Sequence, residues 1–232
     1  MHRREFCTII IEDQKKRIGM KTTLILIRHG QSESNKAKIF TGHTNTELTK
    51  LGIEQARLVA SALKDVHIDK IYASDLSRAY DTGLPVAQTH GLIIEKDPAL
   101  REINAGKWNG LHFDEIATLY PEDYMKWMTD IGRARCTGGE AVAELYHRTV
   151  KRVLEISEEN LGKTVCIASH ATPVRAVCAY ASGIKAEDLE KEPFPGNASI
   201  SVVEYENGQL AAKIKGDTSH LGGLATFLPD DI

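Results

Sequence analysis

Cysteine, net charge and long hydrophobic runs are all scarce in this sequence. Only four of its 232 residues are cysteine, and no two of them form a C-x-x-C pair. A chain of this length does not need disulfide bridges, so dispersed cysteines favour a reduced, cytoplasmic protein in which Cys166 and Cys178 are buried. No apolar stretch approaches the ~18 residues of a membrane span. Because the formal charge is −3, whereas nucleic acids and anionic membranes usually bind a basic surface, we expect neither as a partner.

Common motifs for metals, nucleotides and serine nucleophiles are also missing. The chain has no H-E-x-x-H and no G-x-S-x-G, so neither a zinc peptidase nor a serine hydrolase is indicated. Gly162, Lys163 and Thr164 match the end of a phosphate-binding loop, but Ser157 stands where that loop has its first glycine. This segment also precedes a predicted strand instead of following one. We therefore expect no metal and no cofactor.

Residues 1–19 are predicted to be an N-terminal extension and not a secretion signal. The apolar stretch 6–11 is too short for a signal-peptide core, and charged residues follow it without a small-residue cleavage site. Met20 then opens a strand-like run, which indicates either an internal start or a loosely attached, disordered extension. No repeat, linker or low-complexity stretch divides the rest. With 42% hydrophobic residues, residues 20–232 are expected to fold as one domain.

Short apolar runs alternate with amphipathic stretches along that domain. We predict strands over residues 22–27, 70–73, 92–95 and 164–168, and a hairpin with strands at 199–205 and 210–214. Helices are predicted after Thr49, around Arg78, within 113–130, after Gly139 and from about Pro173. The first of these should bury one stripe made of Ile53, Ala56, Val59, Ala60 and Leu63. The alternation predicts the α/β class: a three-layer αβα sandwich with a mostly parallel central sheet, helices on both faces and a small helical cap insertion.

Charged and nucleophilic side chains follow the predicted strands. In open α/β sheets, ligands bind at the carboxyl ends of the strands, so these residues should face one site. They are Arg28 and His29, then Asp75 and Arg78, then Arg101 and Glu102, and finally His170. A single arginine or histidine of this kind is more often a surface charge or a structural residue. Together they predict an anion site with a nucleophile and an acid.

The same residues resemble a known family. Residues 28–35 (RHGQSESN) resemble the R-H-G-x-[TS]-x-x-N signature of the histidine phosphatase superfamily, which includes the cofactor-dependent phosphoglycerate mutases. Further segments resemble the family's later blocks in the same order: 40–42 (FTG), 48–56, 74–79 (SDLSRA), 100–102 (LRE), 106–110 (GKWNG), 139–140 (GE) and 169–170 (SH). The resemblance covers residues 21–224.

The resemblance implies a role for each matching residue. His29 would attack phosphorus and carry a phosphohistidine, for which it must be neutral, and the nearby cations Arg28 and Arg78 disfavour its protonation. Arg28, Arg78 and His170 would stabilise the transferring phosphoryl group. Glu102 would protonate the leaving oxygen and later activate water. The predicted substrate-binding residues are Ser32, Asn35, Thr41, Gly42, Arg101, Ala171 and Thr172.

Departures from the family pattern bear on the reaction. Ala171 stands where many members have glycine, and Asn109 where an acidic residue is common. The acid lacks the E-R-x-Y-G motif typical of mutases, and the segment 113–135 is compact. Since a short lid admits water, we predict a metal-independent phosphatase acting on a small phosphorylated metabolite, as a monomer or a homodimer. A cofactor-dependent phosphoglycerate mutase and a noncatalytic phospho-ligand binder are the alternatives. Four aromatic residues either line the leaving-group pocket or pack the cap: Trp108, Phe113, Tyr124 and Trp127.

Overall fold

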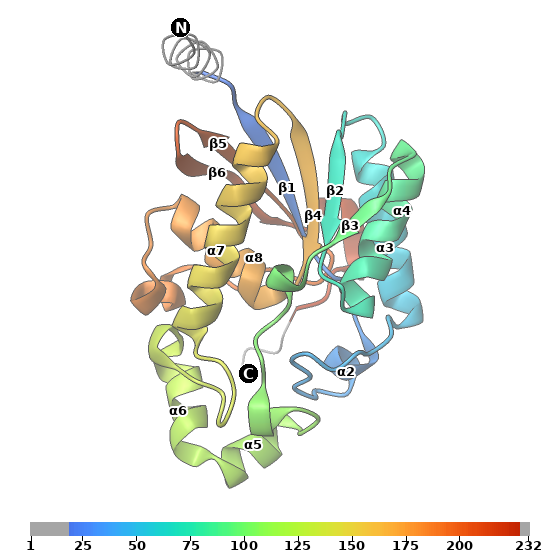
Figure 1. The fold of residues 1–232 in the computed structure, drawn as a ribbon. Coiled ribbons are helices and arrows are strands. Elements are labelled where there is room, and N and C mark those ends of the chain that lie inside the picture. Colours follow the sequence, from blue (N-terminus) through green and yellow to red (C-terminus); the bar gives the residue numbers. More distant parts are fainter. Residues whose placement is uncertain (1–18, 228–232) are drawn as a thin grey trace, which may run out of the picture.

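The computed structural model describes residues 19–227, which form a six-stranded sheet between two helical layers (Figure 1). The strand order is β3-β2-β4-β1-β5-β6. The strands are β1 (Thr22–Arg28), β2 (Lys70–Ala73), β3 (Ile94–Lys96), β4 (Thr164–Ser169), β5 (Ile200–Glu206) and β6 (Gln209–Asp217). The first four are parallel to one another, and β5 runs antiparallel to both β1 and β6. The mostly parallel sheet and the C-terminal hairpin are therefore confirmed.

The central strand β1 shows why helices cover both faces. Leu24 and Leu26 belong to one buried cluster, while Ile25 and Ile27 belong to another, because successive side chains of a strand point to opposite faces. The Ile25 face packs on α3 (Lys50–Leu63), α4 (Ser77–His90) and the 3₁₀ segment η5 (Ser219–Leu224). The Leu24 face packs on α7 (Val142–Glu159) and α8 (Ala171–Ala181). This arrangement is the predicted αβα sandwich.

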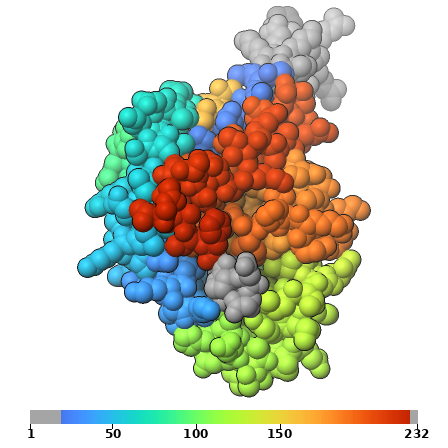
Figure 2. Space-filling view, turned by 180° about the vertical axis from the view of Figure 1, so that it is seen from behind, coloured from blue at the N-terminus to red at the C-terminus, as the bar shows by residue number. Residues whose placement is uncertain are grey.

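A small helical cap lies beyond the carboxyl ends of the strands. Its helices are α5 (Phe113–Leu119) and α6 (Pro121–Thr129), with the 3₁₀ turns η2 (Gly106–Trp108) and η3 (Ile131–Arg133) beside them. The fully buried Trp108 lies in a cap cluster that continues onto α7 through Val142 and Leu145. Seen from behind, the yellow-green cap residues gather at one end of the molecule (Figure 2). The predicted cap insertion is therefore present.

Shorter elements complete the path of the chain. Helix α2 (Glu33–Lys36) follows β1, and η1 (Pro98–Leu100) follows β3. The 3₁₀ segment η4 (Ala186–Lys191) follows α8 and leads toward β5. Among residues 19–227, no helix is long and apolar enough to cross a membrane. The predicted extension over residues 1–19 lies outside the described residues, apart from Gly19.

Two local predictions were wrong. Ile53 is 44% exposed, because the first turn of α3 packs its backbone against the loop after β1. A Cβ on Gly52 would collide with the Gln31 carbonyl, and this close contact turns the neighbouring side chain outward. Strand β3 also begins at Ile94 and not at Leu92. Gly91 ends α4 in the left-handed region, and Leu92 N–H donates to the carbonyl of the last turn at Ala87.

Candidate active site

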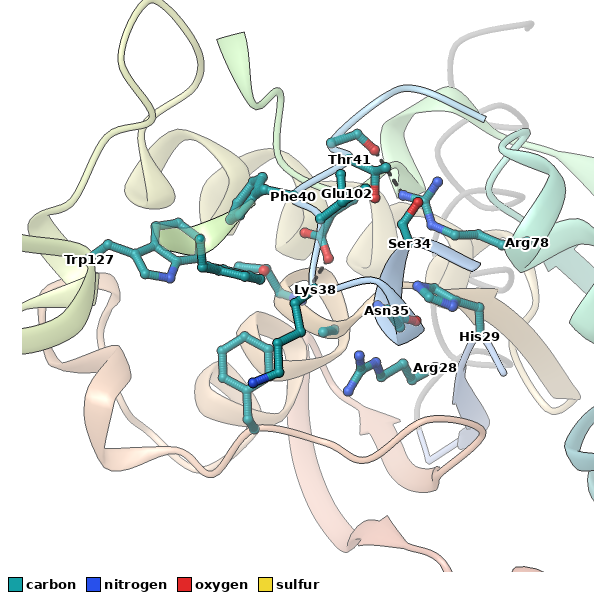
Figure 3. Close-up of a pocket in the computed structure, with 16 residues that line it drawn as sticks. Arg28, His29, Ser34, Asn35, Lys38, Phe40, Thr41, Arg78, Glu102 and Trp127 are labelled. Carbon is teal, nitrogen blue, oxygen red and sulfur yellow. Dashed lines mark hydrogen bonds between the residues drawn. The ribbon is translucent and has the colours of Figure 1, made fainter. Parts of the chain in front are cut away.

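One pocket lies where β1 and β4 end, between the sheet and the cap. Its lining includes four of the five predicted catalytic residues, Arg28, His29, Arg78 and Glu102, together with the predicted Asn35, but not His170. The predicted Thr41, Gly42, Ala171 and Thr172 also line it. Figure 3 shows Arg28, His29 and Arg78 on one side of Glu102, with Phe40 and Trp127 on the other. The pocket therefore has a cationic end and an aromatic end.

His29 is buried at the end of β1 and has one fixed ring orientation. Its backbone N–H donates to the Ser169 carbonyl of β4 at 2.9 Å, which continues the strand pairing. Nδ1 lies 2.7 Å from the Gly30 carbonyl oxygen. A carbonyl can only accept, so Nδ1 carries the proton and Nε2 keeps its lone pair in the neutral ring. Burial, followed by the charges of Arg78 and Arg28, holds the pKa of His29 well below its usual value.

Two arginines are held in place by backbone carbonyls. Arg28 Nη1 donates to Pro195 O at 2.6 Å, while Arg78 donates to Gly42 O at 2.8 Å and to Thr44 O at 2.9 Å. Burial lowers the pKa of each guanidinium to about 10, so both remain charged at neutral pH. Arg28 Nε is buried and has no hydrogen-bond partner within residues 19–227. These neutral acceptors orient the two cations without cancelling their charge, as an anion site requires.

Glu102 follows η1 and is oriented by backbone donors. Oε1 accepts from its neighbour Ile103 N–H at 2.8 Å, and Oε2 accepts from Thr172 N–H at 3.3 Å, in the first turn of α8. The Glu102 carbonyl in turn accepts from His43 Nε2 at 2.8 Å and from Arg148 Nη2 at 2.9 Å. Both the carboxylate and the backbone of this residue are therefore fixed.

His170 lies at the end of β4, beside His29. The two ring centroids are 5.2 Å apart, and His170 Nε2 pairs with Ser74 Oγ at 2.9 Å. Its Nδ1 is buried and has no partner in the described part of the chain. Burial and the charge of Arg78 hold the pKa of His170 well below the usual value. An anion in the pocket would favour protonation of this ring.

Asn35 is oriented by neighbours on both sides. Its Oδ1 accepts from Ser32 N–H and from Asn197 Nδ2, both at 3.1 Å. The Asn35 amide nitrogen is therefore the group left to donate into the pocket. Ser32 instead caps α2 by accepting from Asn35 N–H, and it is not part of the pocket lining. Asn197, which the sequence analysis did not assign to the site, also donates to the His29 carbonyl at 3.2 Å.

Arg101 is not brought into the pocket. Its Nε donates to Asp75 Oδ1 at 2.7 Å, and its Nη2 pairs with the other oxygen of the same carboxylate. The predicted meeting of strand-end residues therefore splits: Asp75 and Arg101 neutralise each other outside the lining, while Glu102 faces inward. The lining also includes three residues not identified from the sequence, Lys38, Ile39 and Phe194.

The four aromatic residues of the middle segment divide between their two predicted roles. Phe113 and Trp127 line the pocket. Trp108 is fully buried in the cap cluster, where its indole N–H donates to Thr137 Oγ1 at 3.0 Å. The Tyr124 ring packs edge-on against Trp108 with centroids 6.5 Å apart. Trp127 also packs in the cap cluster, with its ring centroid 5.7 Å from that of Trp108, so this residue has both roles.

The buried neutral histidines make a prediction about stability. Because their pKa values are lower in the folded than in the unfolded chain, unfolding takes up protons below about pH 6.5. The free energy of unfolding should fall by roughly 1.4 kcal/mol per pH unit for each ring between about pH 6 and pH 5. Urea denaturation at pH 7.5, 6.0 and 5.0 measures this slope. In the variant His170→Gln, the pH slope of the free energy of unfolding should be smaller by the contribution of one histidine. An unchanged slope would contradict a lowered pKa for His170 in the folded chain.

Taken together, fold and pocket define an α/β protein with a cationic pocket beside an unprotonated histidine. The family model "Histidine phosphatase superfamily (branch 1)" matches residues 24–218, and the chain belongs to this family.

Known proteins of this family match most of the chain. Phosphoserine phosphatase 1 of Hydrogenobacter thermophilus is 34% identical over 201 residues, which are 86% of this chain and 94% of that protein. Phosphoglycerate mutase-like protein 4 of Arabidopsis thaliana is 30% identical, with 85% of this chain and 86% of that protein covered. The solved structure of Bacillus stearothermophilus YhfR has a TM-score of 0.82 and 28% identity, with coverage of 86% and 99%. These matches confirm the predicted family, the fold and the enzyme class of phosphomonoesterase.

Proposed function

We propose that the protein is a metal-independent phosphatase that hydrolyses a small phosphorylated metabolite through a phosphohistidine on His29. One observation carries the proposal: the Nδ1–H bond to Gly30 leaves Nε2 as the free, basic nitrogen of a ring that faces Arg28 and Arg78. A phosphoryl group bound by the two guanidinium groups would lie next to this lone pair.

In the first step, His29 Nε2 forms a bond to phosphorus while the bond to the leaving oxygen breaks. The transition state spreads negative charge over three oxygens, which Arg28, Arg78 and the Asn35 amide are placed to stabilise. Glu102, in its protonated form, gives its proton to the leaving alcohol. The phosphorylated ring keeps its Nδ1–H bond to Gly30, so the intermediate is held in the orientation of the free histidine.

In the second step, water replaces the alcohol. Glu102 is now a carboxylate and takes a proton from the water, whose oxygen bonds to phosphorus as the bond to His29 Nε2 breaks. Inorganic phosphate leaves, and Glu102 is again protonated for the next cycle. The backbone N–H groups of Ile103 and Thr172 keep the carboxylate facing the same point in both steps.

The experiment that tests this proposal traps the intermediate. The protein, treated with EDTA, is mixed with ³²P-labelled phosphate monoester and quenched in base within milliseconds. We expect up to one acid-labile, base-stable phosphate per chain and steady release of inorganic phosphate. Turnover that requires an added divalent metal, or turnover without any labelled protein, would overturn the mechanism.

A mutase is the second candidate, because the Arabidopsis relative carries a mutase-like name. It predicts conversion of 3-phosphoglycerate to 2-phosphoglycerate, stimulated by 2,3-bisphosphoglycerate, with little free phosphate. The ratio of isomerised to hydrolysed product separates the two reactions. Phosphate binding without turnover of any ester would instead support a noncatalytic binder.

We also propose a reducing, cytoplasmic setting. Three cysteines among the described residues, Cys136, Cys166 and Cys178, are free and buried. Burial raises the pKa of the Cys166 thiol to about 12, which suits a structural thiol and not a reactive one. Fractionation of the source cell tests this setting, and sedimentation velocity distinguishes a monomer from a homodimer.

Arg148 of α7 is predicted to position the general acid. It donates to the carbonyls of Ala99, Arg101 and Glu102, each at 2.9 Å, and pairs with Glu140. The variant Arg148→Met should lower kcat about 10- to 100-fold for alkyl phosphates, with little change in KM, because the carboxylate moves relative to the leaving oxygen.

Two comparisons separate positioning from general destabilisation. Arg148→Lys should not restore kcat, since one ammonium cannot reach all three carbonyls. Arg152→Met is the matched control, because Arg152 lies one turn further along α7 and pairs with Asp97 without bonding to residues 99–102. Equal losses in the variants at 148 and 152 would contradict the role.

A further inference from the structure

Lys38 is a cation of the pocket that the phosphatase chemistry does not use. The pocket lining within the described residues contains four basic side chains, of which Arg28, His29 and Arg78 belong to the phosphate end. Figure 3 shows Lys38 below Glu102, with its side chain directed away from His29 and Arg78. Its ammonium forms no hydrogen bond or ion pair within residues 19–227, whereas Arg101 is neutralised by Asp75.

The backbone holds Lys38 in a conformation that lysine rarely adopts. Its φ is +56°, in the left-handed region that glycine and asparagine occupy more easily. Lys38 N–H donates to Asn35 O at 3.2 Å, and Lys38 O accepts from Phe113 N–H at 3.4 Å. The residue is thus tied to the phosphate end through Asn35 and to the cap through Phe113. A strained, doubly anchored residue beside a pocket is typical of a functional position.

Much of the remaining pocket lining is apolar. It includes Ile39, Phe40, Phe113, Trp127 and Phe194, none of which carries a charge. Glu102 is protonated while the ester is bound, so an anionic group on the leaving alcohol would find Lys38 as the cation of the described lining that lies outside the phosphate end. The charge is partly exposed to solvent, so its effect should be moderate and should weaken with salt.

We propose that Lys38 forms a subsite for a second anionic group, so that the preferred substrates are small phosphate monoesters whose leaving alcohol carries a carboxylate or another anion. This proposal rests on the phosphatase function above. Lys38 selects the substrate in binding and takes no part in bond making, so its removal should change relative kcat/KM values more than kcat.

The test uses substrate pairs that differ by one anionic group. O-phospho-L-serine and O-phosphoethanolamine differ by the α-carboxylate, and 3-phosphoglycerate and glycerol 1-phosphate differ by a carboxylate in place of a hydroxymethyl group. In a third pair, propane-1,3-diol bisphosphate and propyl phosphate, the additional anionic group is a second phosphate instead of a carboxylate. We expect the anionic member of at least one carboxylate or bisphosphate pair to have about fivefold higher kcat/KM at 20 mM salt, and the difference to shrink at 300 mM.

The variants then assign the preference to Lys38. Lys38→Asn keeps a residue suited to positive φ but removes the charge, so the fivefold preference should disappear while hydrolysis of p-nitrophenyl phosphate changes less than about twofold. Lys38→Glu should reverse the phosphoserine and phosphoethanolamine order. Lys36→Asn is the matched control, because Lys36 is an exposed lysine two residues away that does not line the pocket.

The possible failures are distinguishable. Equal kcat/KM within every pair, or a preference that survives in Lys38→Asn, would overturn the subsite and leave the phosphatase intact. If p-nitrophenyl phosphate were the only ester hydrolysed, the subsite would also be overturned, while the phosphatase function would stand. No hydrolysis of any ester would overturn the proposed function and the subsite together. Which pair shows the larger preference distinguishes a carboxylate from a second phosphate.

Discussion

Replacing His29 by alanine is expected to lower kcat for p-nitrophenyl phosphate by about 10,000-fold or more. The reason is that the variant loses the only proposed nucleophile, while Arg28 and Arg78 can still bind phosphate through contacts that do not involve the ring. The ³²P label on the protein should vanish together with the turnover. Steady-state kinetics and the quenched-labelling experiment measure both losses on the same sample.

A matched histidine variant shows whether the loss is specific. His67→Ala removes a ring whose side chain is 84% exposed and should leave kcat unchanged. Retained binding of inorganic phosphate by His29→Ala, measured by calorimetry, would show that the pocket still forms. If His29→Ala kept activity within tenfold of the native protein, another group would have to be the nucleophile.

Replacing Glu102 by glutamine should separate the two halves of the reaction. An amide cannot give a proton to the leaving oxygen, so alkyl phosphates should lose about 100- to 1,000-fold in kcat. The p-nitrophenolate ion leaves without protonation, so phosphoryl transfer to His29 should remain fast for that ester. Water attack still needs the base, and the phosphohistidine should therefore accumulate.

Stopped-flow kinetics can show this accumulation directly. The Glu102→Gln variant should release about one p-nitrophenol per chain in a burst and then turn over slowly, while an alkyl phosphate should give no burst. The amide oxygen of glutamine can keep the shorter bond, from the Ile103 N–H, whereas its NH2 group cannot accept from the Thr172 N–H. Unchanged binding of inorganic phosphate by this variant is therefore the control that the pocket is preserved. Fast steady turnover of both esters would exclude Glu102 as the acid and base.

The sequence was sufficient for the architecture because each strand end is marked locally. Apolar β-branched runs stop abruptly at polar residues, and the rule that parallel strands share one carboxyl edge places Arg28, His29 and His170 together. The start of α3 is also marked locally. The Thr49 hydroxyl accepts from Gly52 N–H and caps the first turn of the helix, as predicted.

Side-chain direction in loops could not be predicted in the same way. Arg101 and Glu102 are neighbours after one strand, yet the first turns to Asp75 and the second faces the pocket. Lys38, Phe194 and Asn197 were missed because their loops follow no periodic pattern, and tertiary hydrogen bonds fix their paths. The predicted burial of Ile53 was wrong for a related reason. A tertiary backbone contact at Gly52 determines which face of α3 is buried.

The contact between Arg28 and Pro195 has a consequence for how the protein matures during synthesis. The residues that complete the phosphate end come from opposite ends of the chain, 167 positions apart. Asn197, which supports both His29 and Asn35, also follows α8. A nascent chain that ends after α8 would carry both histidines, both arginines and Glu102. It would lack the Pro195 carbonyl that orients Arg28 and the Asn197 amide that supports His29 and Asn35. Activity should therefore arise only when the last strands have left the ribosome, and fragments shortened before residue 192 should be inert.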